Sequence, residues 1–327
     1  MPGRRRIVKG NDISVVVCTR DRPDDVKSCL RSLCYSRLRP LEVLVVDQSS
    51  DGDTARVVGE LGRLSPLPVR YLRLDTAGLT KARNAGIRAS RGEIVAFTDD
   101  DCIVDALWLD AVRRELGGSH VSCLCGQTKP ASHGERPRPA LLSTLNHDRR
   151  RLVRGKHNPI AIGRGNNMAF RRDDLLKLGG FNEQIGVGAS LCAGDDLDIF
   201  YRVLEVGGSI VHAPDAVVLH AQPDDWRAVV RKKRGYSISA AAILASRARY
   251  GDLYAGLLLI GKTLYEFGYL FCGGLLRMNR CLAAIGWNSF VGSLCGLKYV
   301  LDRTFCEEVR RLTHFARESY SARNKRP

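Results

Sequence analysis

Short, largely apolar runs alternate with segments of helical periodicity through the first hundred residues of this chain. The runs are ISVVVC (13–18), LEVLVV (41–46), VRYLRL (69–74) and EIVAFT (93–98). Strands that are buried on both faces of a parallel sheet have this continuous apolar character. After the first run, Pro23 suits the first turn of a helix, and Val26, Leu30 and Leu33 recur at helical spacing. We therefore expect an α/β fold with a mostly parallel sheet that is flanked by helices.

Polar side chains follow each of these four runs. They are Thr19 and Arg20, then Asp47, then Asp75, then Asp99, Asp100 and Asp101. Because ligands of such sheets collect beyond the carboxyl ends of the strands, we expect the four groups to meet at one edge. The segment DQSSDGD, which begins at Asp47, is equally typical of a tight loop, because Asp and Ser bond to their own backbone. Both interpretations of Asp47 stay open.

The three consecutive carboxylates, Asp99 to Asp101, carry the strongest chemical signal. One of them can cap a helix that begins near Ala106, but a cap uses a single carboxylate. Like charges this close raise the pKa of at least one member unless a cation intervenes. Mg²⁺ or Mn²⁺, bound by one or two carboxylates and by phosphate oxygens, is the usual cation in such a setting. The sequence therefore predicts a divalent ion that bridges a diphosphate.

Neither of the common glycine-rich phosphate loops is present. The chain has no GxxxxGK[ST] motif, and CTRDRPDD rather than GxGxxG follows the first run. A bound nucleotide is therefore expected to be held by the metal ion and by side chains.

A second acidic centre lies in GDDLDIFYRVLEVGG. Apolar residues recur there at helical spacing from Leu197 onward, which puts Asp195 and Asp196 in the first turn of a helix. Capping and the helix dipole alone can explain acidic residues at that place. The functional interpretation is a rigidly mounted carboxylate that acts as a general base.

A glycine-rich stretch and a late histidine complete the candidate residues. Asn166, Asn167 and Gly188 lie in the stretch, where the asparagines can bond to substrate hydroxyls or to their own turns. His220 follows a predicted strand over 216–219 and is a candidate metal ligand, although a lone histidine is more often structural.

Six segments of the chain stand in a recognisable order and spacing. They are ISVVVCTRDRP, LEVLVVDQSSDGD, GLTKARNAGIRASRGEIVAFTDDD, GNNMAFRRDDLLKLGGFNE, GDDLDIFYRVLEVGG and HAPDAVVLH. Together they resemble the family 2 glycosyltransferases of the GT-A fold, over about residues 12–221. The resemblance implies a Rossmann-like sheet and a metal-dependent enzyme that moves a sugar from a nucleotide-diphosphate donor, with UDP favoured, to an acceptor hydroxyl with inversion.

The resemblance also implies roles for individual residues. Those that resemble donor-binding positions are Thr19, Arg20, Arg22, Asp47, Arg83, Asn84, Asp99 and Asp100. Those that resemble metal-binding positions are Asp101, Asp99 and His220, with Mg²⁺ or Mn²⁺ as the ion. Asp196 matches the catalytic base, and Asp195 stands where many relatives have Glu. Asn166, Asn167 and Gly188 are the positions expected near the acceptor.

The C-terminal third differs in charge and hydropathy. From residue 226 to 327 it has 18 Lys and Arg against 6 Asp and Glu, which accounts for 12 of the net charge of +16. The apolar stretch 253–276 is long enough to span a bilayer, but Lys262 and Glu266 interrupt it, and 281–301 is a second apolar, glycine-rich stretch. We expect helices that lie on an anionic membrane surface, with a soluble helical appendage as the alternative.

These patterns lead to a three-part organisation: a basic tail over 1–11, a catalytic domain over 12–225 and a helical region over 226–327. The odd number of cysteines, 11, and the absence of an apolar segment behind the basic start predict a cytoplasmic protein on the membrane's cytoplasmic face. A membrane location suits a saccharide or lipid-linked acceptor.

Two other classes of protein are alternatives to the transferase. The first is a sugar-nucleotide pyrophosphorylase, but this chain lacks the glycine-rich signature that such an enzyme carries after its first strand. A nucleic-acid-binding protein would use the basic C-terminal third against phosphates, but the charges there alternate with long apolar runs. We therefore expect no nucleic-acid partner.

Overall fold

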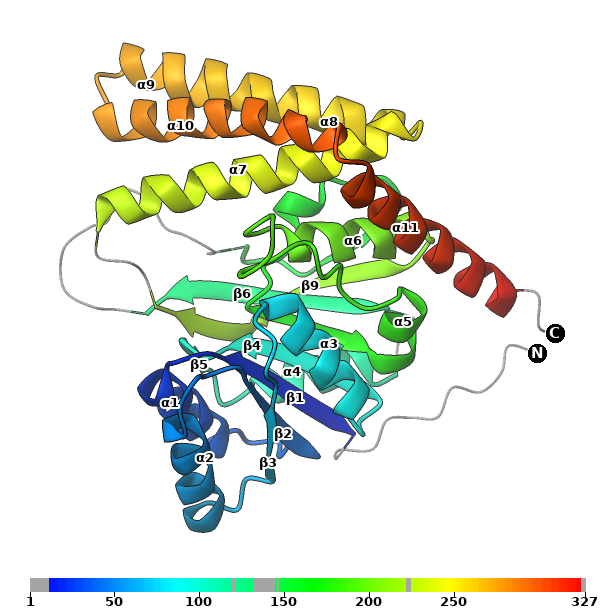
Figure 1. The fold of residues 1–327 in the computed structure, drawn as a ribbon. Coiled ribbons are helices and arrows are strands. Elements are labelled where there is room, and N and C mark those ends of the chain that lie inside the picture. Colours follow the sequence, from blue (N-terminus) through cyan, green and yellow to red (C-terminus); the bar gives the residue numbers. More distant parts are fainter. Residues whose placement is uncertain (1–11, 119–120, 132–144, 146, 222–224, 325–327) are drawn as a thin grey trace.

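The computed structural model describes residues 12–118, 121–131, 145, 147–221 and 225–324, so the predicted tail over 1–11 lies outside the described residues. Its centre is a nine-stranded sheet (Figure 1). In sheet order the strands are β3 (Val69–Arg73), β2 (Glu42–Asp47), β1 (Ile13–Thr19), β4 (Ile94–Asp99), β8 (Asn167–Arg171), β6 (Cys123–Pro130), β9 (Ser209–His220) and β5 (Cys102–Val104), and β7 (Arg151–Arg154) also pairs with β9.

The first four strands are parallel, as the sequence predicts. Their register aligns Thr19 with Asp47 and Cys18 with Asp99, so the carboxyl ends of β1, β2 and β4 lie at one edge. Strand β8 runs antiparallel to both β4 and β6, and β9 pairs parallel with β6. The expected α/β class with flanking helices is confirmed, and the second half of the sheet is mixed.

Each face of the sheet packs against its own set of helices. Val15 and Val17 face α1 (Pro23–Cys34), α2 (Asp53–Leu64) and α4 (Trp108–Leu116), whereas Val16 and Cys18 face α3 (Leu79–Ala89), α5 (Arg172–Lys177) and α6 (Asp195–Glu205). This division follows from the two-residue period of a strand. A Cβ atom on Gly86 of α3 would lie 2.5 Å from Cγ1 of Val16, so glycine is required for this close packing.

The C-terminal region is helical, as expected. Helix α7 (Trp226–Arg249) crosses above α6, and its first turn is capped by the Asp225 carboxylate (Figure 1). Helix α8 (Leu253–Leu264), a π-helical segment (Tyr265–Cys272) and α9 (Gly273–Leu276) run out along α7, and α10 (Arg280–Leu297) returns beside them. Helix α11 (Arg303–Asn324) then packs against α5 and α6. Within the described residues, no helix combines the length and hydropathy that a bilayer-crossing segment needs.

Buried ion pairs join this region to the helices that cover the sheet. Arg247 of α7 donates to Asp198 at 3.1 Å and to Glu205 at 2.9 Å, and both acceptors lie on α6. Arg202 pairs with the same Asp198 at 2.7 Å. The side chains of Arg202, Arg247 and Asp198 are each at most 3% exposed. The C-terminal region therefore holds helix α6 in place, and this helix begins with Asp195 and Asp196. The predicted division into domains stays a prediction.

Candidate active site

The loops after β1 and β2 meet at the carboxyl edge of the sheet. The backbone N–H of Asp21 donates to Oγ of Ser49 at 2.8 Å, and the Asp21 carboxylate accepts from the backbone N–H of Ser50 at 3.0 Å. Asp21 adopts a positive φ of 55° in this turn, a conformation that Asp tolerates better than most residues. Asp75, at the end of β3, is exposed and makes an ion pair only at the periphery of this edge, with Arg73.

Asp99, Asp100 and Asp101 form an acidic rim beside these loops. Thr19 donates from Oγ1 to Asp100 at 2.8 Å, and Arg22 reaches Asp100 at 3.3 Å and Asp101 at 3.5 Å. Burial, together with the neighbouring carboxylates, raises the pKa of Asp100 to about 7 and that of Asp101 to about 6. The half-exposed Arg22 and the Thr19 hydroxyl therefore do not offset the combined effect of burial and of the neighbouring carboxylates.

Arg83, on α3, connects the rim to the second acidic centre. Its buried guanidinium donates to Asp99 at 3.1 Å, to Asp195 and to the carbonyl oxygen of Gly165 at 2.9 Å. The ring of Phe181 lies 5.5 Å from the guanidinium carbon. Burial raises the pKa of Asp195 to about 6 against the lowering effect of Arg83, with Asp196 and Asp99 adding to the rise.

Asp196 belongs to the same hydrogen-bonded network. Its Oδ2 accepts from the backbone N–H of Gly165 at 3.1 Å, and its Oδ1 accepts from the N–H of Leu197 at 2.8 Å. Gly165 thus bonds to both Arg83 and Asp196. The half-buried Asp196 carboxylate is held by two backbone donors at the start of α6, on the side of the helix that meets the rim. The two acidic centres predicted from the sequence lie together.

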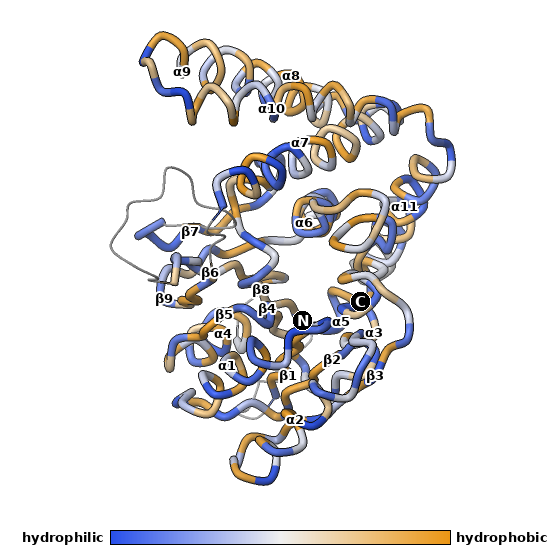
Figure 2. Tube along the Cα trace, turned by 60° about the vertical axis from the view of Figure 1, so that its left-hand side comes forward, coloured by the Kyte–Doolittle hydropathy of each residue, from blue (hydrophilic) through white to orange (hydrophobic). Residues whose placement is uncertain are grey.

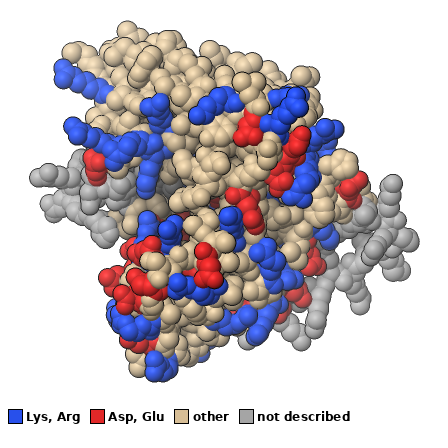
Figure 3. Space-filling view, in the orientation of Figure 1, with Lys and Arg blue, Asp and Glu red and all other residues tan. Residues whose placement is uncertain are grey.

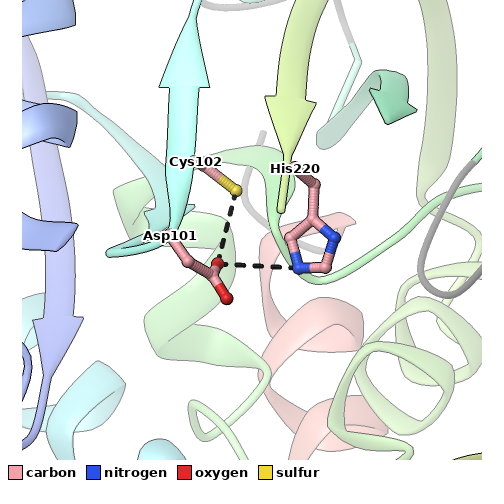
Figure 4. Close-up of side chains that lie close together, drawn as sticks. All are labelled: Asp101, Cys102 and His220. Atoms are coloured by element: carbon pink, nitrogen blue, oxygen red, sulfur yellow. Dashed lines mark hydrogen bonds and ion pairs between the residues drawn. The ribbon is translucent and has the colours of Figure 1, made fainter. Parts of the chain in front are cut away.

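A candidate metal site lies at one end of the acidic rim. Strands β5 and β9 pair Cys102 with His220, and Asp101 precedes Cys102. Oδ1 of Asp101 lies 3.5 Å from Nε2 of His220 and 3.9 Å from Sγ of Cys102, and the three ligand atoms lie within 4.8 Å of one another (Figure 4). Burial lowers the pKa of His220, which favours the neutral imidazole that binds metals. Carboxylate and imidazole ligands, beside carboxylates with unbalanced charge, fit a divalent ion.

The start of α7 also approaches the rim. Burial raises the pKa of Asp101 and lowers that of His220, and Lys232 lowers both. Burial, with Arg164 nearby, also lowers the pKa of Lys233. The sequence predicts only a membrane role for the basic residues of the C-terminal third. Lys232 and Lys233 stand 12 and 13 positions after His220, and this short separation is the signal that would have placed them near the site.

Two predicted donor residues differ in exposure. Asp47 is fully buried, and its carboxylate accepts from the backbone N–H of Ser49 at 2.8 Å and from the hydroxyl of Tyr71 at 2.7 Å. Asp47 therefore stabilises its own loop, as one of the two interpretations of the sequence predicts. Arg20 is exposed and forms an ion pair with Asp21 at 3.4 Å.

Asn84 faces away from the acidic rim. Its side chain bonds to both backbone groups of Phe181, at 2.8 and 2.9 Å, and to Glu183 at 2.9 Å. It also lines a cavity of about 450 Å³ between α3, α5 and α11. Asn84 therefore supports the loop after α5, in contrast to the donor-binding role that the resemblance implies for it.

The three predicted acceptor residues lie in different surroundings. Asn167 is fully buried, accepts from Nε1 of Trp108 at 2.9 Å and donates to two backbone carbonyl groups, so its position is structural. Asn166 is buried and accepts from Thr128 at 3.0 Å. Gly188 is exposed, with a φ of +85°, and a Cβ there would lie 3.1 Å from Cα of Gly78 at the start of α3. Of the three, Gly188 is the one at the surface.

Comparisons with known proteins agree with this arrangement. The family model described as "Glycosyl transferase family 2" matches residues 14–179. The chain is 26% identical over 280 residues to the "Pre-mycofactocin glycosyltransferase" of Mycobacterium tuberculosis, covering 84% of this chain and 56% of that protein. It thus spans about half the length of this relative. It is 26% identical over 303 residues to the "Succinoglycan biosynthesis protein ExoM" of Rhizobium meliloti, covering 88% and 94%.

Two solved structures are similar in fold. The mannosyltransferase PcManGT from Pyrobaculum calidifontis, in complex with GDP-Man and Mn²⁺, aligns with a TM-score of 0.59 at 19% identity, covering 89% of this chain and 88% of that chain. Residues 1–349 of TarS from S. aureus, in complex with UDP-GlcNAc, align with a TM-score of 0.56 at 16% identity, covering 96% and 92%. Both likenesses show a shared GT-A architecture.

Proposed function

This chain belongs to glycosyl transferase family 2, and from that membership we propose that it transfers a sugar from a nucleotide-diphosphate donor to an acceptor hydroxyl with inversion. One observation carries the proposal. A single network, through Arg83 and Gly165, joins the acidic rim to the carboxylate of Asp196. The group that would bind the donor's diphosphate through a cation and the group that can accept the acceptor's proton therefore lie in one site, as a direct transfer between the two substrates requires.

The acidic rim and its neighbours form the donor site. Asp101 and His220 are the residues that would hold Mg²⁺ or Mn²⁺, with the Cys102 thiol beside them. When bound, such an ion stabilises the charge that develops on the departing diphosphate. Asp99, fixed by Arg83, is available to a donor hydroxyl. The Arg22 guanidinium contributes a further positive charge at the same edge.

Asp196 is the proposed general base. Its two backbone hydrogen bonds fix the orientation of the carboxylate while leaving it partly exposed. It removes the proton of the acceptor hydroxyl, and the oxygen attacks the anomeric carbon from the face opposite the diphosphate, which inverts the configuration. Asp195 is a positioning residue, because its pair with Arg83 links the first turn of α6 to Asp99.

The donor and acceptor are proposed by class. The similar structures contain GDP-Man in one case and UDP-GlcNAc in the other. UDP is proposed here on the resemblance of Thr19 and Asp47 to uracil-binding positions. A relative with 23% identity over 254 residues is named "Glucosyl-dolichyl phosphate glucuronosyltransferase", from Haloferax volcanii. That name supports a saccharide or lipid-linked saccharide as the acceptor of this chain.

The variant Asp196→Asn tests the proposed base. Turnover is expected to fall by about 10²–10⁴-fold, because general base catalysis contributes that much. Donor affinity, measured by calorimetry with Mn²⁺ present, is expected to stay unchanged. Asp173→Asn is the matched control, since it removes an exposed carboxylate from the first turn of another helix, α5. Loss of donor affinity in Asp196→Asn, with turnover retained, would contradict the assignment.

A further inference from the structure

The hairpin formed by α8, the π-helical segment, α9 and α10 lies on α7, on the side away from the sheet (Figure 1). Along α8, Leu253, Leu257, Ile260 and Leu264 recur at helical spacing, and they are 58–81% exposed. On α10, Trp287 is 47% exposed and its ring lies 5.1 Å from that of Phe271 on the other arm. We call this surface the outer hairpin face. Orange segments recur along both arms in Figure 2.

The two charges that interrupt the first apolar stretch point inward. Nζ of Lys262 donates to Glu266 and to Ser293, both at 2.6 Å. Glu266 is 5% exposed and also accepts from Ser237 of α7 at 2.6 Å. The i, i+4 pair is therefore satisfied between the hairpin and α7, and the outer hairpin face stays apolar. In Figure 3 the upper end of the molecule, over these helices, is mostly free of charged atoms.

The remaining charges of the hairpin are all positive. Between residues 253 and 301, all of which are described, the charged residues other than the buried pair are Arg277, Arg280 and Lys298, and all three are exposed. The guanidinium of Arg277 lies 4.9 Å from the ring centre of Tyr269, which is itself half exposed. Cations and amphipathic aromatic rings around an apolar face are the combination that favours the interface of an anionic bilayer.

We propose that the outer hairpin face binds the surface of an anionic lipid bilayer. Leu257, Ile260 and Leu264 enter the boundary between headgroups and acyl chains, and Arg277 and Arg280 contact lipid phosphates. A second copy of the chain is a poorer occupant, because a symmetric contact would bring the two sets of cations together. Binding at this face also turns toward the membrane the side of the molecule on which α7 lies beneath the hairpin, and the first turns of α7 approach Asp101 and His220. Access to a lipid-linked acceptor by that route rests on the proposed function.

Vesicle flotation of the full chain, without donor or acceptor, tests the proposal. The chain is expected to float with vesicles of phosphatidylglycerol and phosphatidylcholine in equal parts, and much less with phosphatidylcholine alone. Leu257→Glu combined with Ile260→Glu should lower binding at least about 100-fold, since each inserted apolar side chain contributes roughly tenfold or more. Leu64→Glu is the matched control, because Leu64 is 85% exposed at the end of α2.

Arg277→Glu with Arg280→Glu should lower binding to the anionic vesicles roughly 10- to 100-fold. Circular dichroism melting confirms that each variant is folded. Undiminished binding by Leu257→Glu with Ile260→Glu, or equal binding of the parent chain to both vesicle types, would overturn the proposal. So would light scattering that shows an oligomer dissociating in those variants while the parent chain does not float. None of these readouts depends on transfer activity, so they leave the proposed function untouched.

Discussion

Helix α6 has buried carboxylates in two regions whose surroundings shift the carboxylate pKa in opposite directions. Its first turn brings Asp195 to the acidic rim, where burial and neighbouring carboxylates raise the pKa to about 6. One turn later, burial alone would raise the pKa of Asp198, but Arg202 and Arg247 together hold it below its usual value. Both side chains are buried and both have arginine partners. The difference lies in the balance of charge around each of them.

That difference separates a binding site from a structural joint. Asp198 is shared by two buried guanidinium groups, and Glu205 beside it pairs with Arg247 and Arg317, so no further cation is required there. At the acidic rim, Arg83 and Arg22 face a larger number of carboxylates, and the pKa values rise. The carboxylates outnumber their arginine partners at the acidic rim, whereas the arginines outnumber the carboxylates at the joint. This excess of negative charge is the basis for proposing that a cation binds at the rim.

The largest expected effect comes from Asp198→Asn. Breaking a buried, hydrogen-bonded ion pair by removing one partner costs about 3–5 kcal/mol, because Arg202 and Arg247 are left with too little negative charge. Urea unfolding should show a loss of that size, together with unchanged donor affinity at low denaturant. Asp195→Asn, on the same helix, is the control and should destabilise far less. Equal losses for the two variants would remove the distinction between the regions.

A smaller effect is expected from Asp100→Asn, and it depends on pH. The pKa of Asp100 is about 7 in the folded chain against 3.8 without its surroundings, so the folded chain binds the proton more tightly. Stability contributed in this way is present at low pH and is lost as pH rises from 3.8 to about 7. Asparagine does not ionise, so the variant escapes this loss.

Thermal unfolding in the presence of a chelator measures the effect of Asp100→Asn. The variant's stability relative to the parent chain should increase across the pH window, by on the order of 1–3 kcal/mol at its neutral end. A difference that is constant with pH would show that the charge of Asp100 is balanced. A decrease would mean that the bonds from Thr19 and Arg22 outweigh the cost of burial.

Much of the carboxyl edge of the sheet could be predicted from the sequence, because its determinants are local. A continuous apolar run followed by a polar residue indicates both a buried strand and the end at which ligands bind. The prediction that Thr19, Asp47 and Asp99 lie at one edge is confirmed. Helix α6 could be predicted equally well, since the apolar residues at helical spacing and the carboxylates of its first turn lie within one segment of the sequence.

The remaining features depend on contacts between distant segments. Asp198 and Arg247 are 49 positions apart, and neither has a local pattern that indicates the other. The orientation of the Asn84 and Asn167 side chains is set by hydrogen bonds to backbone carbonyl groups at least 40 positions away in the sequence. The sequence indicates the pairing of Lys262 with Glu266, but the side to which they point depends on Ser237 and Ser293.

The central claim is that the excess negative charge of the acidic rim binds a divalent ion and, through it, a nucleoside diphosphate. Calorimetric titration of UDP and of GDP, with Mn²⁺ and with a chelator, tests it most directly. The parent chain and Asp75→Asn, which alters an exposed carboxylate at the end of β3, should bind one of these nucleotides only when Mn²⁺ is present. Asp101→Asn should lose that binding. Equal affinity with and without Mn²⁺, or full binding by Asp101→Asn, would contradict the account.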